Sequence, residues 1–298
     1  MSAPGPVELA SAGLRRVPGR AGMTRVVARI LASDARCADP QRCARSGVEA
    51  VLPAALGLVR ARSSVPAGDR NGLVHRRCRI RRRPDGAVPP APRCAVRAGW
   101  ELTAVVVHVG RWEVTHWLAR CLERAGGAEV VGAGADPRAG GDGARLEPSA
   151  GRSCGGVQVG GGEGRAGKDG LRVPDASATA GAAARLRIDA ADLSAWARAG
   201  ADPNDIHLRP GAARAAGLAV GGDEVVAHGL LLAALSLAVV PPERTRGVDL
   251  RFTAPVAVPL AGGSAEVAVT GRGDLADRRG TALRRTAAPT GASAAPDR

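Results

Sequence analysis

Large aromatic side chains are almost missing from this chain of 298 residues. It has no Tyr, one Phe and four Trp, whereas aromatic residues normally supply much of the buried area of a protein core. Ala, Val and Leu make up most of the apolar fraction of 45%, which is normal for a globular protein. We therefore expect a core of small aliphatic side chains in one large domain or two smaller ones.

Cysteine spacing typical of a metal site or a disulfide framework is also missing. All six Cys precede residue 160, no pair has CxxC spacing, and no His lies at zinc-finger distance from two of them. The N-terminal residues 1–10 lack the basic and apolar pattern of a signal peptide. These absences predict no metal, no cofactor, no disulfide framework and a cytoplasmic protein.

No apolar run is long enough to span a bilayer. The longest covers residues 225–240 and contains His228, Gly229 and Ser236, whereas a span needs ~20 apolar residues. We expect a buried core helix there and no membrane span.

Positive charge is abundant, with a net charge of +14. Residues 185–271 hold eight Arg and nine Asp or Glu, so the basic excess lies outside that region. The densest run is 76–83. Such a run can bind nucleic-acid or cofactor phosphates, or it can be a solvated strand or loop. No aromatic side chains interleave with it for base stacking, so we favour the solvated segment and consider nucleic acid an unlikely partner.

Changes in composition divide the chain into four parts. Residues 1–125 contain short apolar pieces cut by Pro, Gly and Arg, which predicts a degenerate or poorly ordered region, although 100–122 is typical of strands. Residues 126–184 are rich in Gly and Ala and predict a flexible linker. Residues 185–285 show regular helix and strand signals, and 286–298 predict a disordered tail.

The signals of residues 185–285 favour an α+β domain. The expected elements are a helix capped by Asp189 or Asp192 and ended by Gly200, a short helix over 210–216, a long apolar helix from Gly229 to about Val240, and strands over 248–252, 256–260 and 265–270. The last two strands are expected to be joined by a turn at Gly262-Gly263. One long apolar helix followed by antiparallel strands permits several α+β folds.

The most specific stretch is Ala201-Asp202-Pro203-Asn204-Asp205-Ile206-His207, with Ala227-His228-Gly229 downstream. It resembles the motif of the MaoC-like (R)-specific enoyl-thioester hydratase and 3-hydroxyacyl-thioester dehydratase family. That motif reads Gly-Asp-x-Asn-Pro-x-His and then Ala-His-Gly. The strand 251–256 adds to the resemblance. It implies a hotdog fold, in which an antiparallel sheet wraps round a central helix. We expect either one hotdog or a double hotdog with a degenerate first half.

The resemblance also implies a reaction. It is the hydration of a 2-enoyl thioester, or the dehydration of a (3R)-hydroxyacyl thioester, carried by coenzyme A or acyl-carrier protein. Asp202 and His207 would hold and deprotonate the water and return a proton to C2. The Gly229 N–H, at a helix start, would donate to the thioester carbonyl. Asn204 is expected to shape the loop, and His228 to orient the helix start.

Three departures from the family pattern bear on activity. Ala201 replaces Gly, Asp205 replaces Pro, and the interval from His207 to His228 is longer than in the family. A carboxylate at 205 would raise the pKa of His207 and Asp202, and a displaced Gly229 would slow the reaction. Three functions therefore stay open: an active hydratase, a catalytically inactive hotdog that binds acyl groups or serves as a partner subunit, and a basic nucleic-acid-binding protein. A homodimer or heterodimer is expected by analogy.

Overall fold

A computed structural model describes residues 18–63, 72–97, 99–122, 181–242 and 247–288. Its helices are α2 (Arg20–Leu31), α3 (Pro40–Ser63), α4 (Ala190–Gly200), α5 (Ala212–Ala215), α6 (Gly229–Val239) and the 3-10 turn η3 (Asp205–His207). Its strands are β1 (Val74–Arg82), β2 (Arg93–Arg97), β3 (Trp100–Val109), β4 (Trp112–Cys121), β5 (Ala182–Asp189), β6 (Glu224–Val226), β7 (Val248–Phe252), β8 (Ala257–Pro259), β9 (Ser264–Thr270), β10 (Leu275–Asp277) and β11 (Gly280–Ala287). The predicted linker and tail lie mostly outside the described residues.

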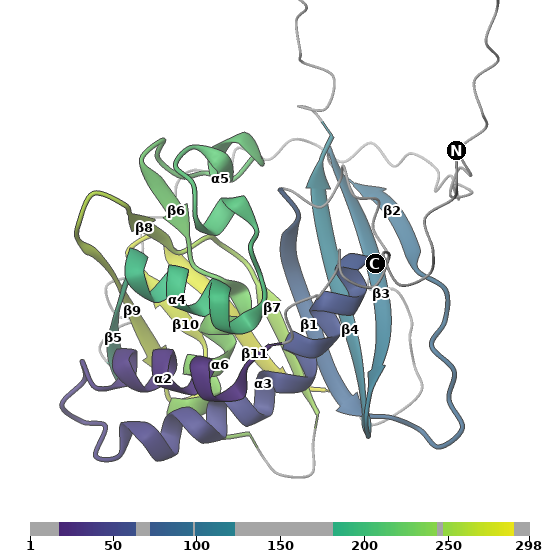
Figure 1. Ribbon diagram of the computed structural model, residues 1–298, viewed down its shortest axis with the longest axis horizontal. Coiled ribbons are helices and arrows are strands. Elements are labelled where there is room, and N and C mark those ends of the chain that lie inside the picture. The colour runs from purple at the N-terminus through teal and green to yellow at the C-terminus, as the bar shows by residue number, and fades with distance from the viewer. Residues whose placement is uncertain (1–17, 64–71, 98, 123–180, 243–246, 289–298) are drawn as a thin grey trace, which may run out of the picture.

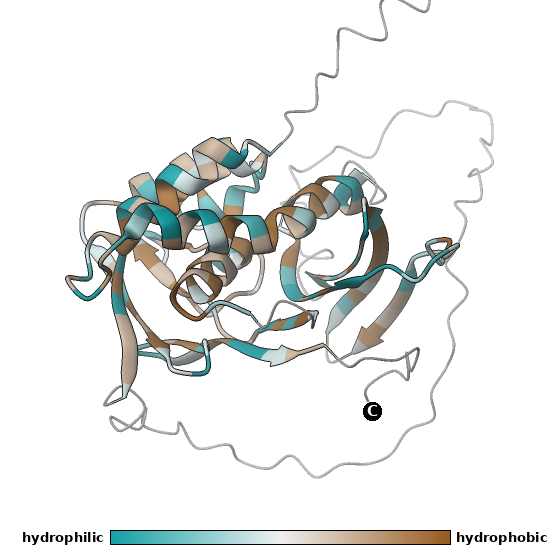
Figure 2. Cartoon of the chain, turned by 90° about the horizontal axis from the view of Figure 1, so that it is seen from below, coloured by the Kyte–Doolittle hydropathy of each residue, from teal (hydrophilic) through white to brown (hydrophobic). Residues whose placement is uncertain are grey.

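One antiparallel sheet of nine strands contains strands from residues 74–121 and from residues 182–287 (Figure 1). Its order is β2-β3-β4-β1-β7-β11-β10-β9-β5. Strand β1 pairs with β4 on one side and with β7 on the other. Backbone hydrogen bonds therefore join the first half, residues 18–122, to the second half, residues 181–288. Figure 2 shows the helices lying over one face of this curved sheet.

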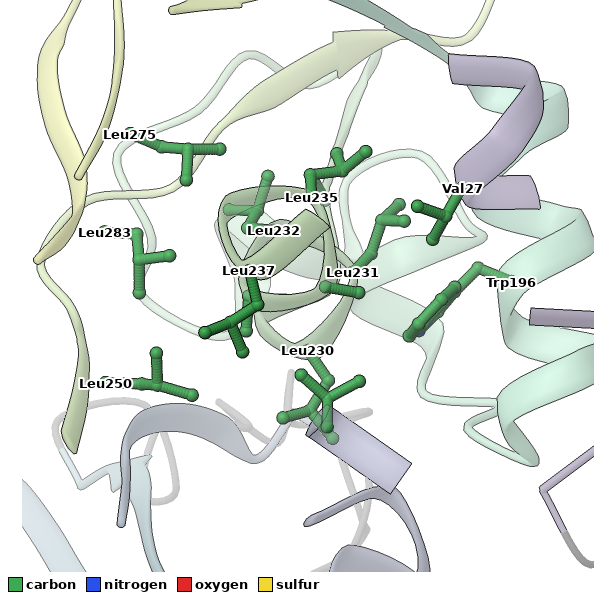
Figure 3. Close-up of a cluster of buried hydrophobic side chains, with 14 of the residues drawn as sticks. Val27, Trp196, Leu230, Leu231, Leu232, Leu235, Leu237, Leu250, Leu275 and Leu283 are labelled. Atoms are coloured by element: carbon green, nitrogen blue, oxygen red, sulfur yellow. The ribbon is translucent and has the colours of Figure 1, made fainter. Parts of the chain in front are cut away.

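Helix α6 is buried all round, as expected for a helix without a polar face. Every residue from Leu230 to Ala238 is buried. Figure 3 shows Val27 of α2 and Trp196 of α4 on one side of α6, and leucines of β7, β10 and β11 on the other. Each buried Leu contributes about 2 kcal/mol of hydrophobic free energy. The α+β class, and the long apolar helix packed against antiparallel strands, are as predicted.

Helix α3 is a second long helix, and it lies against α6 and the first-half strands (Figure 1). It continues through the buried Pro53, although proline residues were expected to interrupt the apolar pieces of this region. Gly47 lets α3 and α6 approach closely, because a Cβ there would lie 2.3 Å from the carbonyl oxygen of Ala234. Helices α2 and α3 both lie within residues 1–125, for which the sequence predicted a degenerate or poorly ordered region without helices.

Several local predictions are confirmed in detail. The stretch 100–122 forms the expected strands, β3 and β4, which pair as a hairpin that turns at Gly110. Asp189 and Asp192 form a reciprocal capping box at the start of α4. The Gly262-Gly263 turn, however, does not join two paired strands. It connects β8 to β9 as expected, but β8 pairs with β6, whereas β9 pairs with β5 and β10.

The arginine run forms β1, and acidic partners hold several of its guanidinium groups. Arg77 and Arg79 contact the buried carboxylate of Asp249 on β7 at 2.6 and 3.0 Å. Arg81 contacts Glu113 on β4 at 2.6 Å. These pairs support the reading of the run as a structural strand.

Within the described ranges, no helix has the length and apolar character to cross a membrane.

Candidate active site

The loop that resembles the family motif begins in a strained conformation. Ala201 caps α4 with φ 53° and ψ 38°, and it is the only residue other than Gly with a positive φ in the described part of the chain. This left-handed conformation costs a residue with a Cβ about 1 kcal/mol. The replacement of the motif Gly by Ala therefore places strain directly before Asp202.

Asn204 connects this loop to the first half of the chain. Its side chain is buried, its Nδ2 donates to the carbonyl of Leu73 at 2.8 Å, and its Oδ1 accepts from the backbone N–H groups of Ile206 and Gly72 at 3.4 Å. Because the amide uses both donor and acceptor, it holds the loop in one position. This placement suits the loop-shaping role expected from the motif.

A cavity of about 50 Å³ brings together the three motif residues. Asp202, His207 and Gly229 all line it. The rest of the lining is mostly apolar, and it also includes Arg62 and His75 from the first half. A cavity of this size holds a few water molecules. The longer interval between His207 and His228 therefore does not separate Gly229 from the acid and the imidazole.

His207 is buried with one ring nitrogen already engaged. Its Nδ1 lies 2.8 Å from the carbonyl of Val226, so Nδ1 carries the proton and Nε2 keeps its lone pair. Burial lowers the pKa of His207, and the charge of Arg62 adds to this, against Asp202 and the Val226 carbonyl, which raise it. The ring is therefore neutral at pH 7 and can act as a base.

Asp202 forms an ion pair with Arg62 of α3, and both side chains are largely buried. Burial alone would raise the pKa of the Asp202 carboxyl, but the charge of Arg62 holds it below the ordinary value. Asp202 is therefore ionised at neutral pH.

Asp205 does not have the effect expected from the sequence. Its carboxylate points toward Arg209, 3.2 Å away on the exposed side of the loop. The pKa values of His207 and Asp202 are both lowered, so the expectation that Asp205 raises them is wrong. Burial decides the direction for His207, and Arg62 decides it for Asp202.

His228 and Gly229 form the start of α6. The His228 ring stacks on His207, its Nε2 lies 3.4 Å from the Asp202 carbonyl oxygen, and its Nδ1 has no hydrogen-bond partner among the described residues. A Cβ at Gly229 would lie 3.0 Å from the Phe252 ring. Glycine therefore lets the Phe252 ring pack closely against the helix start. This helix start lines the cavity, where unpaired N–H groups and the positive end of the helix dipole favour an oxyanion.

Two groups of side chains offer donor atoms at metal-ligand separation. They are Asp202, His207 and His228, and, on β1 and β4, His75, Cys78 and His116. In the first group, Asp202 already pairs with a cation and His207 donates to a carbonyl. In the second, the two imidazoles lie 3.1 Å apart and bond to each other, and burial raises the pKa of the Cys78 thiol. We assign no metal to either group.

Sequence reasoning did not find Arg62 and His75. Both belong to the first half, and both lie at the cavity only because α3 and β1 pack against the second half. Neither stands in a motif, so no local signal could have marked them.

No protein-family model matches the sequence, and no curated protein matches it. Among solved structures, HtdX from Mycobacterium tuberculosis is 19% identical over 91% of this chain and 96% of its own, with a TM-score of 0.44. A MaoC-like dehydratase is 17% identical over 92% of this chain and 91% of its own, with a TM-score of 0.36. The peroxisomal multifunctional enzyme type 2 from Drosophila melanogaster is 13% identical over 95% of this chain and 52% of its own, with a TM-score of 0.42.

The names of these structural neighbours fit the MaoC-like hotdog family that the sequence motif resembles.

Proposed function

We propose that the protein catalyses (R)-specific hydration of 2-enoyl thioesters of coenzyme A or acyl-carrier protein, and the reverse dehydration. One observation carries this proposal. A neutral imidazole with a free Nε2, an ionised carboxylate and an open helix start line the same cavity, as His207, Asp202 and Gly229. The stereochemistry and the thioester carrier follow from the resemblance of the motif.

The arrangement suits addition of water across the double bond. Asp202 and His207 hold one water molecule. The water oxygen bonds to C3 as one of its protons passes to this pair of side chains. The electron pair of the double bond moves through C2 toward the thioester oxygen, and the N–H of Gly229 stabilises the negative charge there. The proton then returns to C2, which restores the carbonyl and yields a 3-hydroxyacyl thioester. Dehydration is the same path in reverse.

We also propose that the chain is a double hotdog. Helix α3 with β1–β4 forms the first repeat, and α6 with β5, β7 and β9–β11 forms the second. The join between β1 and β7 in one sheet supports this division. The loop with Asp202 and His207 belongs to the second repeat, whereas Arg62 and His75 of the first repeat complete the cavity wall.

A second candidate function is acyl binding without turnover. The ion pair between Asp202 and Arg62 favours it, because a carboxylate held by a cation is a weaker base. The strained backbone of Ala201, directly before Asp202, also favours this second candidate. This protein would bind thioesters and leave the double bond unchanged.

The test follows the loss of conjugated-enoyl absorbance with short and long 2-enoyl thioesters of both carriers. Turnover should collapse in Asp202→Asn and in His207→Ala, and it should survive in the matched control Asp205→Asn, whose carboxylate faces Arg209. Binding of thioester without turnover in folded wild-type protein would establish the second candidate. Turnover that survives both substitutions would refute the assigned pair.

A further inference from the structure

Arg62 is a largely buried cation of the first half that contacts the second half through Asp202. It lies in the last turn of α3, and its side chain is 14% exposed. One guanidinium nitrogen donates to Asp202, while Nε is buried with no hydrogen-bond partner among the described residues. Arg62 also lines a second small cavity beside Trp196 and Ala201. A long polar side chain thus reaches from the first half to the carboxylate of the second.

The groups around Asp202 leave the counter-charge to Arg62. Besides Arg62 of α3, the titratable groups facing the carboxylate are His75 of β1, His207 of η3 and His228 before α6. Burial is the largest cause lowering the pKa of all three imidazoles, so they are neutral at pH 7. The guanidinium group of Arg62 is therefore the positive charge that faces this carboxylate.

A buried carboxylate without a counter-charge is strongly unfavourable. Asp202 would take up a proton or turn away from the cavity if Arg62 were removed. The backbone N–H of Asn204 also donates to this carboxylate, but at 3.4 Å it is a weaker contact than the ion pair with Arg62. The ion pair therefore gives Asp202 both its charge and its direction.

On the basis of the proposed hydratase function, we propose that Arg62 is a positioning residue for Asp202. Helix α3 of the first half supplies the cation that holds the reactive carboxylate of the second half at the cavity wall. The first half is thus part of the active site.

Kinetics distinguish this role from a merely structural one. In Arg62→Gln, Asp202 should be protonated at higher pH. The acid limb of kcat/KM should move upward, because without Arg62 the pKa values of both Asp202 and His207 rise, and the rate at pH 7 should fall at least tenfold, because Asp202 is no longer held at the cavity. Arg62→Lys should restore most of the rate. The matched control is Arg60→Gln, two residues earlier on α3, where the guanidinium donates to the exposed carbonyl of His108 at 2.8 Å; its profile should not change. A wild-type profile in Arg62→Gln would overturn the proposal.

A thermal mutant cycle tests the same contact without using activity. Arg62→Met should lower the melting temperature markedly in the wild-type background and much less in the Asp202→Asn background, where the buried charge is gone. Additive losses would overturn the proposal, even if the single variant does not fold well enough for kinetics. If the cycle shows coupling while wild-type protein has no turnover, the contact stands and the hydratase function fails.

Discussion

The imidazole rings of His207 and His228 stack with their centroids 3.6 Å apart and their planes tilted by 23°. Two rings this close are seldom positively charged at the same time, because each imidazolium charge disfavours the other. Burial is the largest cause lowering the pKa of each ring, and His207 adds to the effect on His228. Burial therefore keeps His207 uncharged in the site, and the stacked His207 ring helps to lower the pKa of His228.

The rate should depend on pH through His207. Its neutral form is the active one, and burial lowers its pKa below the ordinary 6.5. Activity should therefore persist below pH 6.5 and fall only as the pH drops through the lowered pKa. A kcat/KM profile between pH 5 and 9 measures this. An acid limb with its midpoint above 6.5 would contradict the assignment of a neutral His207 as the base.

Stability should also fall in mild acid. The pKa values of four imidazoles are lowered in the folded state, that of His75 to about 3, those of His116 and His228 well below the ordinary value, and that of His207 below it, with burial as the largest cause of each. Below pH 6.5 the unfolded chain takes up protons that the folded chain does not. Each such group therefore removes about 1.4 kcal/mol per pH unit until its folded pKa is reached. Urea unfolding at pH 7.5 and 5.5 measures the loss, and equal free energies of unfolding at the two pH values would rule it out.

Ala201→Gly should stabilise the protein by about 1 kcal/mol, because Gly adopts φ 53° without the steric cost of a Cβ. The matched control is Ala195→Gly in the interior of α4, which should destabilise by about 1 kcal/mol. Denaturant unfolding of both variants gives the comparison. The strain at Ala201 would be disproved by a loss of stability in both.

Gly229→Ala should slow turnover and destabilise by about 1–3 kcal/mol, because its Cβ would lie 3.0 Å from the Phe252 ring. Gly222→Ala is the control, since a Cβ there meets nothing within 4 Å. Adding Phe252→Leu to Gly229→Ala should return stability but not rate, because the new methyl still covers the helix start. Full recovery of rate in the double variant would argue against a role for this N–H.

Asp249→Asn should cost about 3 kcal/mol of folding free energy, because it leaves the guanidinium groups of Arg77 and Arg79 without their buried carboxylate. The control is Glu266→Gln, which removes an exposed ion pair with Arg187 at 3.3 Å and should cost less than about 1 kcal/mol. Unfolding curves of the two variants decide the point. Similar small losses would mean that the junction of β1 and β7 does not depend on this charge.

The second half of the chain could be predicted because its signals are local. The caps of α4, the glycine at the start of α6 and the prolines after it each act within one or two turns. The first half could not, since the arginines of β1 are neutralised by Asp249, far away in sequence. The motif is also local, and it marked Asp202 and His207 as candidate site residues, which both line the cavity. The direction of the Asp205 side chain and the approach of Arg62 depend on packing, which the sequence does not display.

The pairing of β1 with β7, the packing of α3 on α6 and the hydrogen bond from Asn204 to Leu73 are all noncovalent. The site therefore depends on noncovalent contacts between residues 18–122 and residues 181–288. A substitution that weakens the packing of α3 on α6 should disturb the site, even where it lies far from Asp202 and His207 in the sequence.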